Sequence, residues 1–88
     1  MVSKEEFKEE VWEIAEEIHA KPKQIRVRSM KSKVGSCTPK KIITFDSSVL
    51  SLDVNFRREA IIHELLHLRY RNHGKLFKAA LRAYLNQG

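Results

Sequence analysis

Hydrophobic positions recur at helical spacing over residues 3–20. Ser3 followed by Glu6 is a capping-box pattern, which is typical of a helix N-terminus. Pro22 follows the last hydrophobic position and ends the predicted helix. The spacing places one apolar stripe on the helix and glutamates on the opposite side, so we expect the stripe to pack into the core. Its members are Phe7, Val11, Ile14, Ala15 and Ile18, with Trp12 at the border.

The pattern then changes to alternation over residues 24–30. Ile25 and Val27 face one way while Arg26 and Arg28 face the other, which predicts a half-buried strand with a basic outer face.

Glycine, serine and proline punctuate residues 31–41, which predicts a loop. The apolar run over residues 42–45 predicts a second strand, which we expect to be antiparallel to the first. Residues 46–52 form a serine-rich connection.

Two helices are predicted for the second half of the chain. Asp53 stands at the N-cap of a helix that runs to about Arg69 or Tyr70. Residues 72–74 break it, and a final helix covers residues 75–85. The positions of the final helix with core spacing are Leu76, Phe77, Ala80, Leu81 and Tyr84.

The order helix, strand, strand, helix, helix predicts an α+β fold, and its 88 residues suit one domain over residues 1–88. Cys37 is the one cysteine, which excludes an intramolecular disulfide and points to a reducing compartment. The sequence shows no signal-peptide pattern and no stretch of about 20 apolar residues that could span a membrane. We therefore expect a cytoplasmic protein with no membrane partner.

The net charge of +6 is unevenly distributed, with −5 in residues 1–20 and +11 in residues 21–88. A basic body can attract nucleic acid, so DNA association is one interpretation, and a solvated lysine-rich surface is the other. The candidate basic face consists of Arg26, Arg28, Lys31, Lys33, Lys40 and Lys41.

The run His63-Glu64-Leu65-Leu66-His67 has the HExxH spacing of zinc peptidases. On a helix, His63 and His67 stand about 40° apart on one face and about 6 Å apart along the axis, so both imidazoles can bind one metal ion. Glu64 flanks that face, where it can act as a general base toward a water molecule. Two structural histidines are the alternative, but the apolar surroundings favour a metal because unpaired buried polar groups are costly.

Catalytic zinc usually has three protein ligands. No Asp or Glu follows His67, and His73 is the remaining imidazole in this half of the chain. On a straight helix, His73 would lie about 9 Å beyond His67 and about 120° round from it. We therefore expect the chain to leave the helix between Arg69 and His73, because Asn72 and Gly74 tolerate unusual backbone conformations. His73 is then the hypothesised third ligand, and a surface histidine in a turn is the alternative.

Two other residues could in principle bind metal. His19 lies near the end of the first helix, where a cation suits the helix dipole, which predicts a structural role. Cys37 could approach the metal from the loop, although we favour a small buried residue.

The chain resembles the YgjP-like and SprT-like (WLM) zinc metallopeptidases, the YgjP-like branch more closely, over about residues 25–85. The resemblance rests on the K-S-x-x-G-S-C loop, the HExxH helix, and the third histidine followed closely by a phenylalanine. Val34 stands where the YgjP-like pattern usually has tryptophan. The resemblance implies a compact minimal zincin, in which a small sheet lies above the active-site helix and offers an edge strand to an extended substrate. It also implies one Zn²⁺ ion held by His63, His67 and His73, with Glu64 as the catalytic residue.

These observations favour a zinc metallopeptidase that hydrolyses peptide bonds of a protein or peptide substrate. A peptide could add to the strand at residues 42–45 or to its partner. Candidate stabilisers of the oxyanion are Tyr70, Tyr84, Arg69 and Arg71. One alternative is a metal-dependent hydrolase of phosphate esters or nucleotides. The other is a zinc-stabilised module with little activity that binds nucleic acid or protein.

Overall fold

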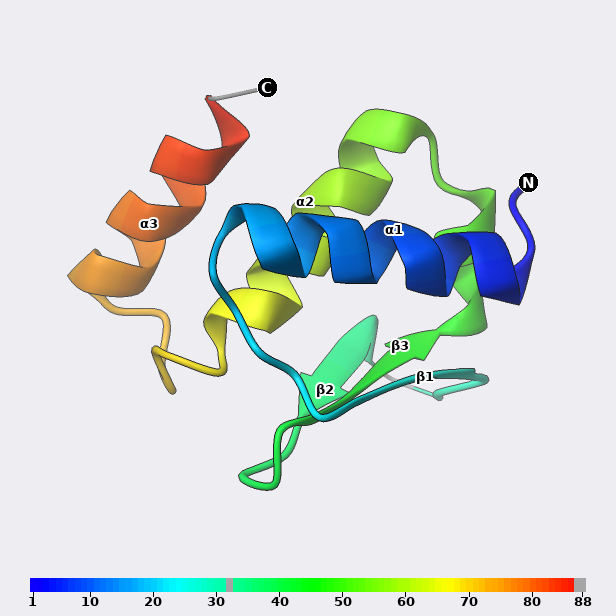
Figure 1. Cartoon of the computed structure of the whole chain (residues 1–88), viewed down its shortest axis with the longest axis horizontal. Coiled ribbons are helices and arrows are strands. Elements are labelled where there is room, and N and C mark those ends of the chain that lie inside the picture. Colours follow the sequence, from blue (N-terminus) through cyan, green and yellow to red (C-terminus); the bar gives the residue numbers. More distant parts are fainter. Residues whose placement is uncertain (32, 87–88) are drawn as a thin grey trace.

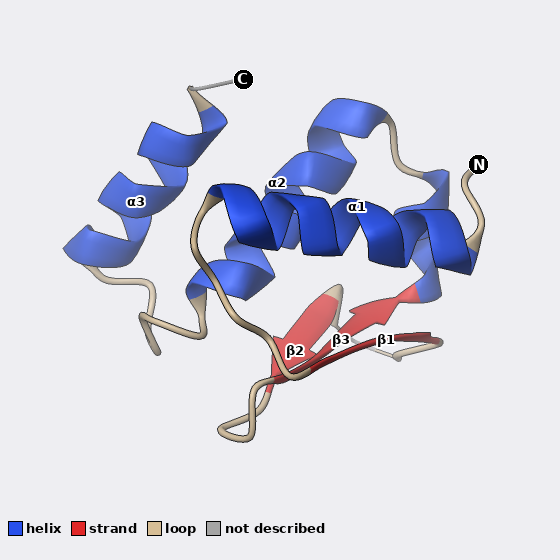
Figure 2. Cartoon of the chain, in the orientation of Figure 1, coloured by secondary structure: helices blue, strands red, loops and turns tan. Residues whose placement is uncertain are grey.

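The computed structural model describes residues 1–31 and 33–86, and its elements are shown in Figure 1. In chain order they are α1 (Lys4–Glu17), β1 (Gln24–Arg28), β2 (Gly35–Cys37), β3 (Ile42–Asp46), the 3₁₀ helix η1 (Ser47–Ser51), α2 (Val54–Leu66) and α3 (Lys75–Leu85). Helices α1 and α2 lie over one face of the three-stranded sheet (Figure 2). The expected α+β fold is confirmed. None of the helices in the described residues is long and apolar enough to cross a membrane.

Helix α1 has the predicted capping box. The backbone N–H of Glu6 donates to Ser3 Oγ (3.1 Å), and the backbone N–H of Ser3 donates to Glu6 Oε1 (3.0 Å). The predicted apolar stripe is buried, and Trp12 at its border is 45% exposed. His19 follows the helix in the left-handed conformation (φ 58°), which allows the N–H of Ala20 to reach the carbonyl of Ala15 (2.8 Å).

Strand β1 has the predicted alternation, with Ile25 and Val27 buried and its two arginines exposed. The prediction that the next strand is antiparallel to it is wrong. Strand β3 pairs parallel to β1, from Gln24 opposite Ile42 to Arg28 opposite Asp46. The chain can return parallel because another strand intervenes between the two in sequence.

That strand is β2, which lies within the predicted loop over residues 31–41. It pairs antiparallel with β3, with Gly35 opposite Phe45 and Cys37 opposite Ile43. Glycine and serine are rare in strands, so the local pattern does not reveal β2, and its pairing with β3 forms it. The sheet order β1-β3-β2 makes β3 the central strand. Residues 42–45 are therefore paired on both sides and cannot accept a further strand, whereas β2 is an edge.

Helix α2 begins as predicted, because Asp53 Oδ1 accepts from the N–H groups of Asn55 (2.9 Å) and Phe56 (3.0 Å). It ends at Leu66, three residues before the earlier predicted end. Helix α3 has the predicted bounds, with Phe77 2% exposed. The prediction of Leu76 as a core residue is wrong, since Leu76 is 71% exposed. Ala80, Leu81 and Tyr84 are partly buried against the core.

The core lies between the sheet and the helices. Its buried members are Phe7, Val11, Ile14, Ala15, Ile18, Ile25, Val27, Ile43, Phe45, Val49, Leu50, Ile61, Ile62, Leu65, Leu66 and Phe77. Glu64 is the one buried charged residue in the described part of the chain, and its burial draws attention to the end of α2.

Candidate metal centre

The three histidines of the second half of the chain converge at the end of α2. His63 lies in its last turn, His67 is its C-cap, and His73 comes from the segment before α3. One nitrogen from each ring lies within 4.8 Å of the others, and His67 Nε2 is 3.0 Å from His73 Nε2. The three residues that the sequence predicts as ligands are therefore brought together and could hold a metal ion.

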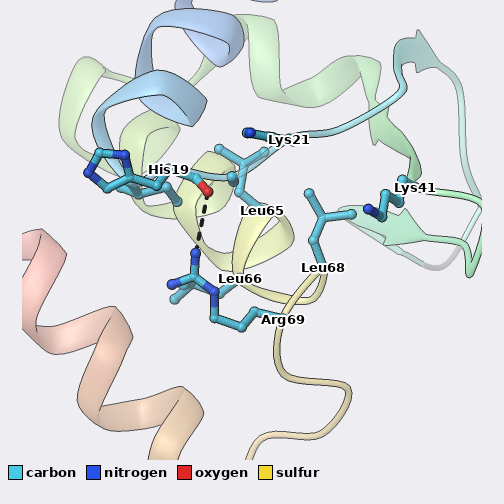
Figure 3. Close-up of a pocket in the computed structure, with 9 residues that line it drawn as sticks. His19, Lys21, Lys41, Leu65, Leu66, Leu68 and Arg69 are labelled. Atoms are coloured by element: carbon cyan, nitrogen blue, oxygen red, sulfur yellow. Dashed lines mark hydrogen bonds between the residues drawn. The ribbon is translucent and has the colours of Figure 1, made fainter.

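The early end of α2 makes this convergence possible. The N–H groups of Arg69 (3.0 Å) and Tyr70 (2.8 Å) both donate to the carbonyl of Leu66, which tightens the last turn. The guanidinium of Arg69 also donates to the carbonyl of His19 (3.3 Å), which ties this turn to the end of α1 (Figure 3).

The helix is broken before His73 as expected, but no residue at the break has a left-handed backbone conformation. Neither Asn72 nor Gly74 has a positive φ; among the described non-glycine residues, only His19 and Lys41 do. Instead, the Asn72 side-chain oxygen accepts from the N–H of Gly74 (3.2 Å), and this local bond shapes the turn that carries His73.

A backbone carbonyl orients His67. His67 Nδ1 lies 3.1 Å from the carbonyl oxygen of Tyr70, which requires Nδ1 to carry the hydrogen. A neutral His67 then has its lone pair on Nε2, which points at His73. Metal-binding histidines are held in this way by a hydrogen bond from the other ring nitrogen.

Phe77 from α3 packs against all three imidazoles. Its ring centroid lies 5.2 Å from that of His63, and 4.8 Å from those of His67 and His73. The sequence predicts Phe77 as a core residue but does not show this contact. The sequence feature that could have indicated this contact is the position of Phe77, four residues after His73 and in the first turn of α3.

Glu64 is 6% exposed and lies beneath the edge strand. Its Oε2 is 3.2 Å from His63 Nδ1. A Cβ atom on Gly35 would stand 2.9 Å from Glu64 Cγ, so only glycine leaves room for this carboxylate. The sequence shows Gly35 within the K-S-x-x-G-S-C loop, but its role depends on the contact between β2 and α2.

A hollow of about 450 Å³ opens beside these groups, and we call it the metal-site hollow. It is lined by Lys33, Gly35, Ser36, Cys37, Thr38, Pro39, His63, Glu64, His67, Arg71 and His73. Of the candidate oxyanion stabilisers, Arg71 lines it and neither Tyr70 nor Tyr84 does. Both tyrosines pack partly buried against the core. Arg69 lines a different hollow, where it faces the end of α1 (Figure 3).

The predicted basic face is divided among several parts of the surface. Lys33 lines the metal-site hollow, whereas Lys41 lines the hollow of Arg69. Arg26 and Arg28 are exposed on β1. Lys31 and Lys40 are exposed in the connections beside β2, where they line neither hollow.

Cys37 is half-buried in the wall of the metal-site hollow. Burial raises the pKa of its thiol, and the nearby charge of Glu64 adds to the increase. The cluster of candidate ligands in the described residues contains the three histidines and not Cys37.

The three imidazoles suit zinc. Tetrahedral zinc holds nitrogen ligands at about 2.0–2.1 Å, which separates two such nitrogens by about 3.3 Å. The 3.0 Å between His67 Nε2 and His73 Nε2 is close to that value. Three imidazoles that could hold a metal ion lie beside an open hollow, and catalytic zinc sites have this arrangement, whereas structural sites have four protein ligands.

Solved structures share this fold. Abylysin from Pyrococcus abyssi, described as a metallopeptidase zymogen, superposes with a TM-score of 0.75 at 22% identity, over 86% of this chain and 76% of that one. Jannalysin from Methanocaldococcus jannaschii, also described as a metallopeptidase zymogen, gives a TM-score of 0.78 at 29% identity, over 89% and 80%. A comparison with curated proteins gave no match.

The family comparison identifies the chain more directly. The model of the YgjP-like metallopeptidase domain matches residues 2–87, which is nearly the full length. The chain therefore belongs to the YgjP-like metallopeptidase family, as the resemblance of its loop and HExxH motifs implies.

Proposed function

We propose that this metallopeptidase is zinc-dependent, with one ion held by His63, His67 and His73 and with Glu64 as general base. The convergence of three imidazole nitrogens within 4.8 Å, beside a buried carboxylate, carries the proposal. When bound, zinc would lower the pKa of a coordinated water and polarise the substrate carbonyl.

Glu64 supplies the proton transfer. Its carboxylate lies in the wall of the metal-site hollow, where it can accept the proton of the attacking water and pass it to the leaving amine. Gly35 has no side chain, which leaves the space against β2 that the Glu64 side chain occupies.

Arg71 is the proposed stabiliser of the oxyanion. Among the arginines and tyrosines considered, it is the one that lines the metal-site hollow with the histidines. A guanidinium provides several N–H donors, which suits developing negative charge.

The edge strand β2 is the proposed platform for an extended peptide. Its residues Gly35, Ser36 and Cys37 all line the metal-site hollow, so a peptide paired with β2 would pass over the histidines. Pairing supplies backbone hydrogen bonds that do not depend on the peptide's sequence.

The test is elemental analysis for zinc together with cleavage of an unfolded protein on the same samples. We expect wild type to hold one zinc and to cleave, and Glu64→Gln to hold zinc without cleaving. Glu13→Gln is the control, since Glu13 is an exposed glutamate on α1, outside the metal-site hollow. His73→Ala should lose tight zinc binding. Cleavage by zinc-loaded Glu64→Gln would contradict the assigned base, and wild type without zinc would contradict the site.

The alternatives give other results in the same assays. Hydrolysis of a phosphate ester in preference to peptides would favour the phosphate-ester hydrolase. For the DNA-binding module, the exposed Arg26 and Arg28 on β1 supply the supporting observation. Salt-sensitive DNA binding that Arg26→Ala and Arg28→Ala weaken, without cleavage of any protein, would favour that module.

A further inference from the structure

The hollow that Arg69 lines has no residue in common with the metal-site hollow. It measures about 230 Å³, and we call it the basic hollow. Its wall carries three permanent cations from three separate segments: Lys21 follows α1, Lys41 precedes β3, and Arg69 follows α2 (Figure 3). No Asp or Glu is among the described residues that line it.

The rest of the wall is mostly apolar, with side chains of Ile18, Leu65, Leu66 and Leu68. Three of these are buried, and Leu68 is partly buried. Charges of one sign in a cleft with such low-dielectric walls raise the local concentration of the oppositely charged ion. The basic hollow therefore favours an anion.

Compensation of helix dipoles accounts for only part of this positive charge. Helices α1 and α2 both end at the basic hollow, and each helix C-terminus carries about half a unit of negative charge. The two ends together amount to about one unit, against three cations. The bond from Arg69 to the carbonyl of His19 occupies one of the five N–H donors of the guanidinium. The positive charge therefore exceeds what the helix ends require.

The backbone of Lys41 supports a role for its side chain. Its φ is 65°, in the left-handed region that favours glycine, and hydrogen bonds hold it there. The N–H of Lys41 donates to the carbonyl of Thr38 (2.9 Å), and its carbonyl accepts from the N–H of Lys23 (2.8 Å). Glycine would suit this position better, so backbone stability does not explain the lysine. The lysine does place a cation in the basic hollow.

We propose that the basic hollow binds one phosphate dianion, either free or as the monoester group of a small ligand. A guanidinium can pair with two phosphate oxygens, and two ammonium groups neutralise the dianion as point charges. The surface of α1 beside the hollow favours a compact anion, because Glu13 and Glu16 are exposed there and would repel an extended polyanion. Glu16 lines an adjoining hollow together with Lys21.

An exposed aromatic ring beside the basic hollow can distinguish a nucleotide from free phosphate. Trp12 is 45% exposed and lines the same adjoining hollow as Glu16. His19, Ala20 and Lys21 line both this hollow and the basic one. A nucleotide could therefore stack its base on Trp12 while its phosphate lies in the basic hollow.

The experiment measures the binding of inorganic phosphate to the zinc-loaded protein by calorimetry. Lys41→Gly should weaken binding about tenfold, because a charge-assisted hydrogen bond is lost. It should leave the midpoint of thermal unfolding without phosphate unchanged or higher, since glycine suits the backbone at this position. Lys21→Gln, at an exposed position, should weaken binding by a similar factor. Lys33→Gln is the matched control, an exposed lysine that lines the metal-site hollow instead, and should bind as wild type does.

Adenosine monophosphate identifies the source of the phosphate group. If it binds more tightly than inorganic phosphate and Trp12→Leu removes the difference, the ligand is a nucleotide. Equal affinities favour free phosphate. In both cases Lys41→Gly and Lys21→Gln should weaken the binding.

Two results would overturn the inference. If Lys33→Gln weakens phosphate binding and Lys41→Gly and Lys21→Gln do not, the anion binds at the metal-site hollow. If a single-stranded oligonucleotide binds but inorganic phosphate and adenosine monophosphate do not, the hollow is not a site for a compact anion. Glu64→Gln should bind phosphate as wild type does, so a failure of the peptidase proposal would leave this inference standing.

Discussion

Gly35 lies against Glu64 so closely that a side chain at this position has no space. A Cβ atom on Gly35 would stand 2.9 Å from Glu64 Cγ, and 3.1 Å from both Glu64 Cδ and the carbonyl oxygen of Thr44. The carbonyl belongs to the central strand and cannot move independently. A methyl group would therefore displace the Glu64 side chain or the edge strand.

Gly35→Ala should lower kcat substantially while zinc content is unchanged, because Glu64 moves but the histidines do not. Displacement of a catalytic group by about 1 Å can lower the rate about 100-fold. Ser51→Ala is the control, since Ser51 is exposed in η1, outside the metal-site hollow. Equal kcat in Gly35→Ala and wild type would refute the proposed positioning.

Phe77→Leu should weaken zinc binding by about 10-fold to 100-fold, which is the usual effect of losing a residue that supports metal ligands. The smaller side chain keeps the core apolar but removes the ring that contacts all three imidazoles. Phe45→Leu is a matched control, because Phe45 is a buried aromatic residue that packs on Phe7 in the core. A competitive chelator titration measures both variants, and equal affinities would exclude a role for Phe77.

Arg71→Ala should reduce kcat by about 100-fold to 1,000-fold, as expected for loss of an oxyanion donor, with a smaller change in KM. Arg71→Lys should restore part of kcat. The control is Arg82→Ala, whose side chain is exposed on α3 outside the metal-site hollow. If Arg71→Ala changes KM alone, the arginine binds substrate and does not stabilise the transition state.

Glu10→Gln should lower the free energy of unfolding by about 1–3 kcal/mol, because it disrupts charge-assisted hydrogen bonds that are largely shielded from water. Glu10 accepts from Arg57 Nε (2.6 Å) and Nη2 (3.1 Å), which joins α1 to α2. Glu17→Gln alters a similar pair with Arg58, but Glu17 is 56% exposed and should contribute about 0–1 kcal/mol. Urea unfolding compares them, and similar losses would contradict this ranking.

Asp46→Ala should destabilise the protein more at about pH 7 than at about pH 2. Hydrogen bonds from Ser48 and from the N–H of Met30 lower the pKa of the Asp46 carboxyl in the folded protein. Since the folded pKa lies below the unfolded one, the stabilisation is present above the unfolded pKa. It is lost as the pH falls through the folded value. Urea unfolding at both pH values tests this, and an equal effect of the substitution at each would contradict it.

Local pattern was sufficient to predict the three helices, the first strand and the candidate ligands. The capping box at Ser3, the N-cap at Asp53 and the apolar stripe of α1 depend on neighbours within a few residues, and such short-range chemistry is visible in sequence. His63, Glu64 and His67 share one turn of α2, so helical geometry alone places them together.

Tertiary contacts decided the remaining features. The strand at Gly35 forms through its antiparallel pairing with β3, and the parallel direction of β3 relative to β1 is also a pairing between segments distant in sequence. His73 reaches the metal centre because α2 ends early and its turn is tied to the end of α1. The roles of Gly35 and Phe77 appear only when β2 and α3 pack beside α2, since each role is a contact between segments distant in sequence. Local periodicity carries no information about such contacts, which is why the sequence predicted the candidate ligands but not the residues that pack around them.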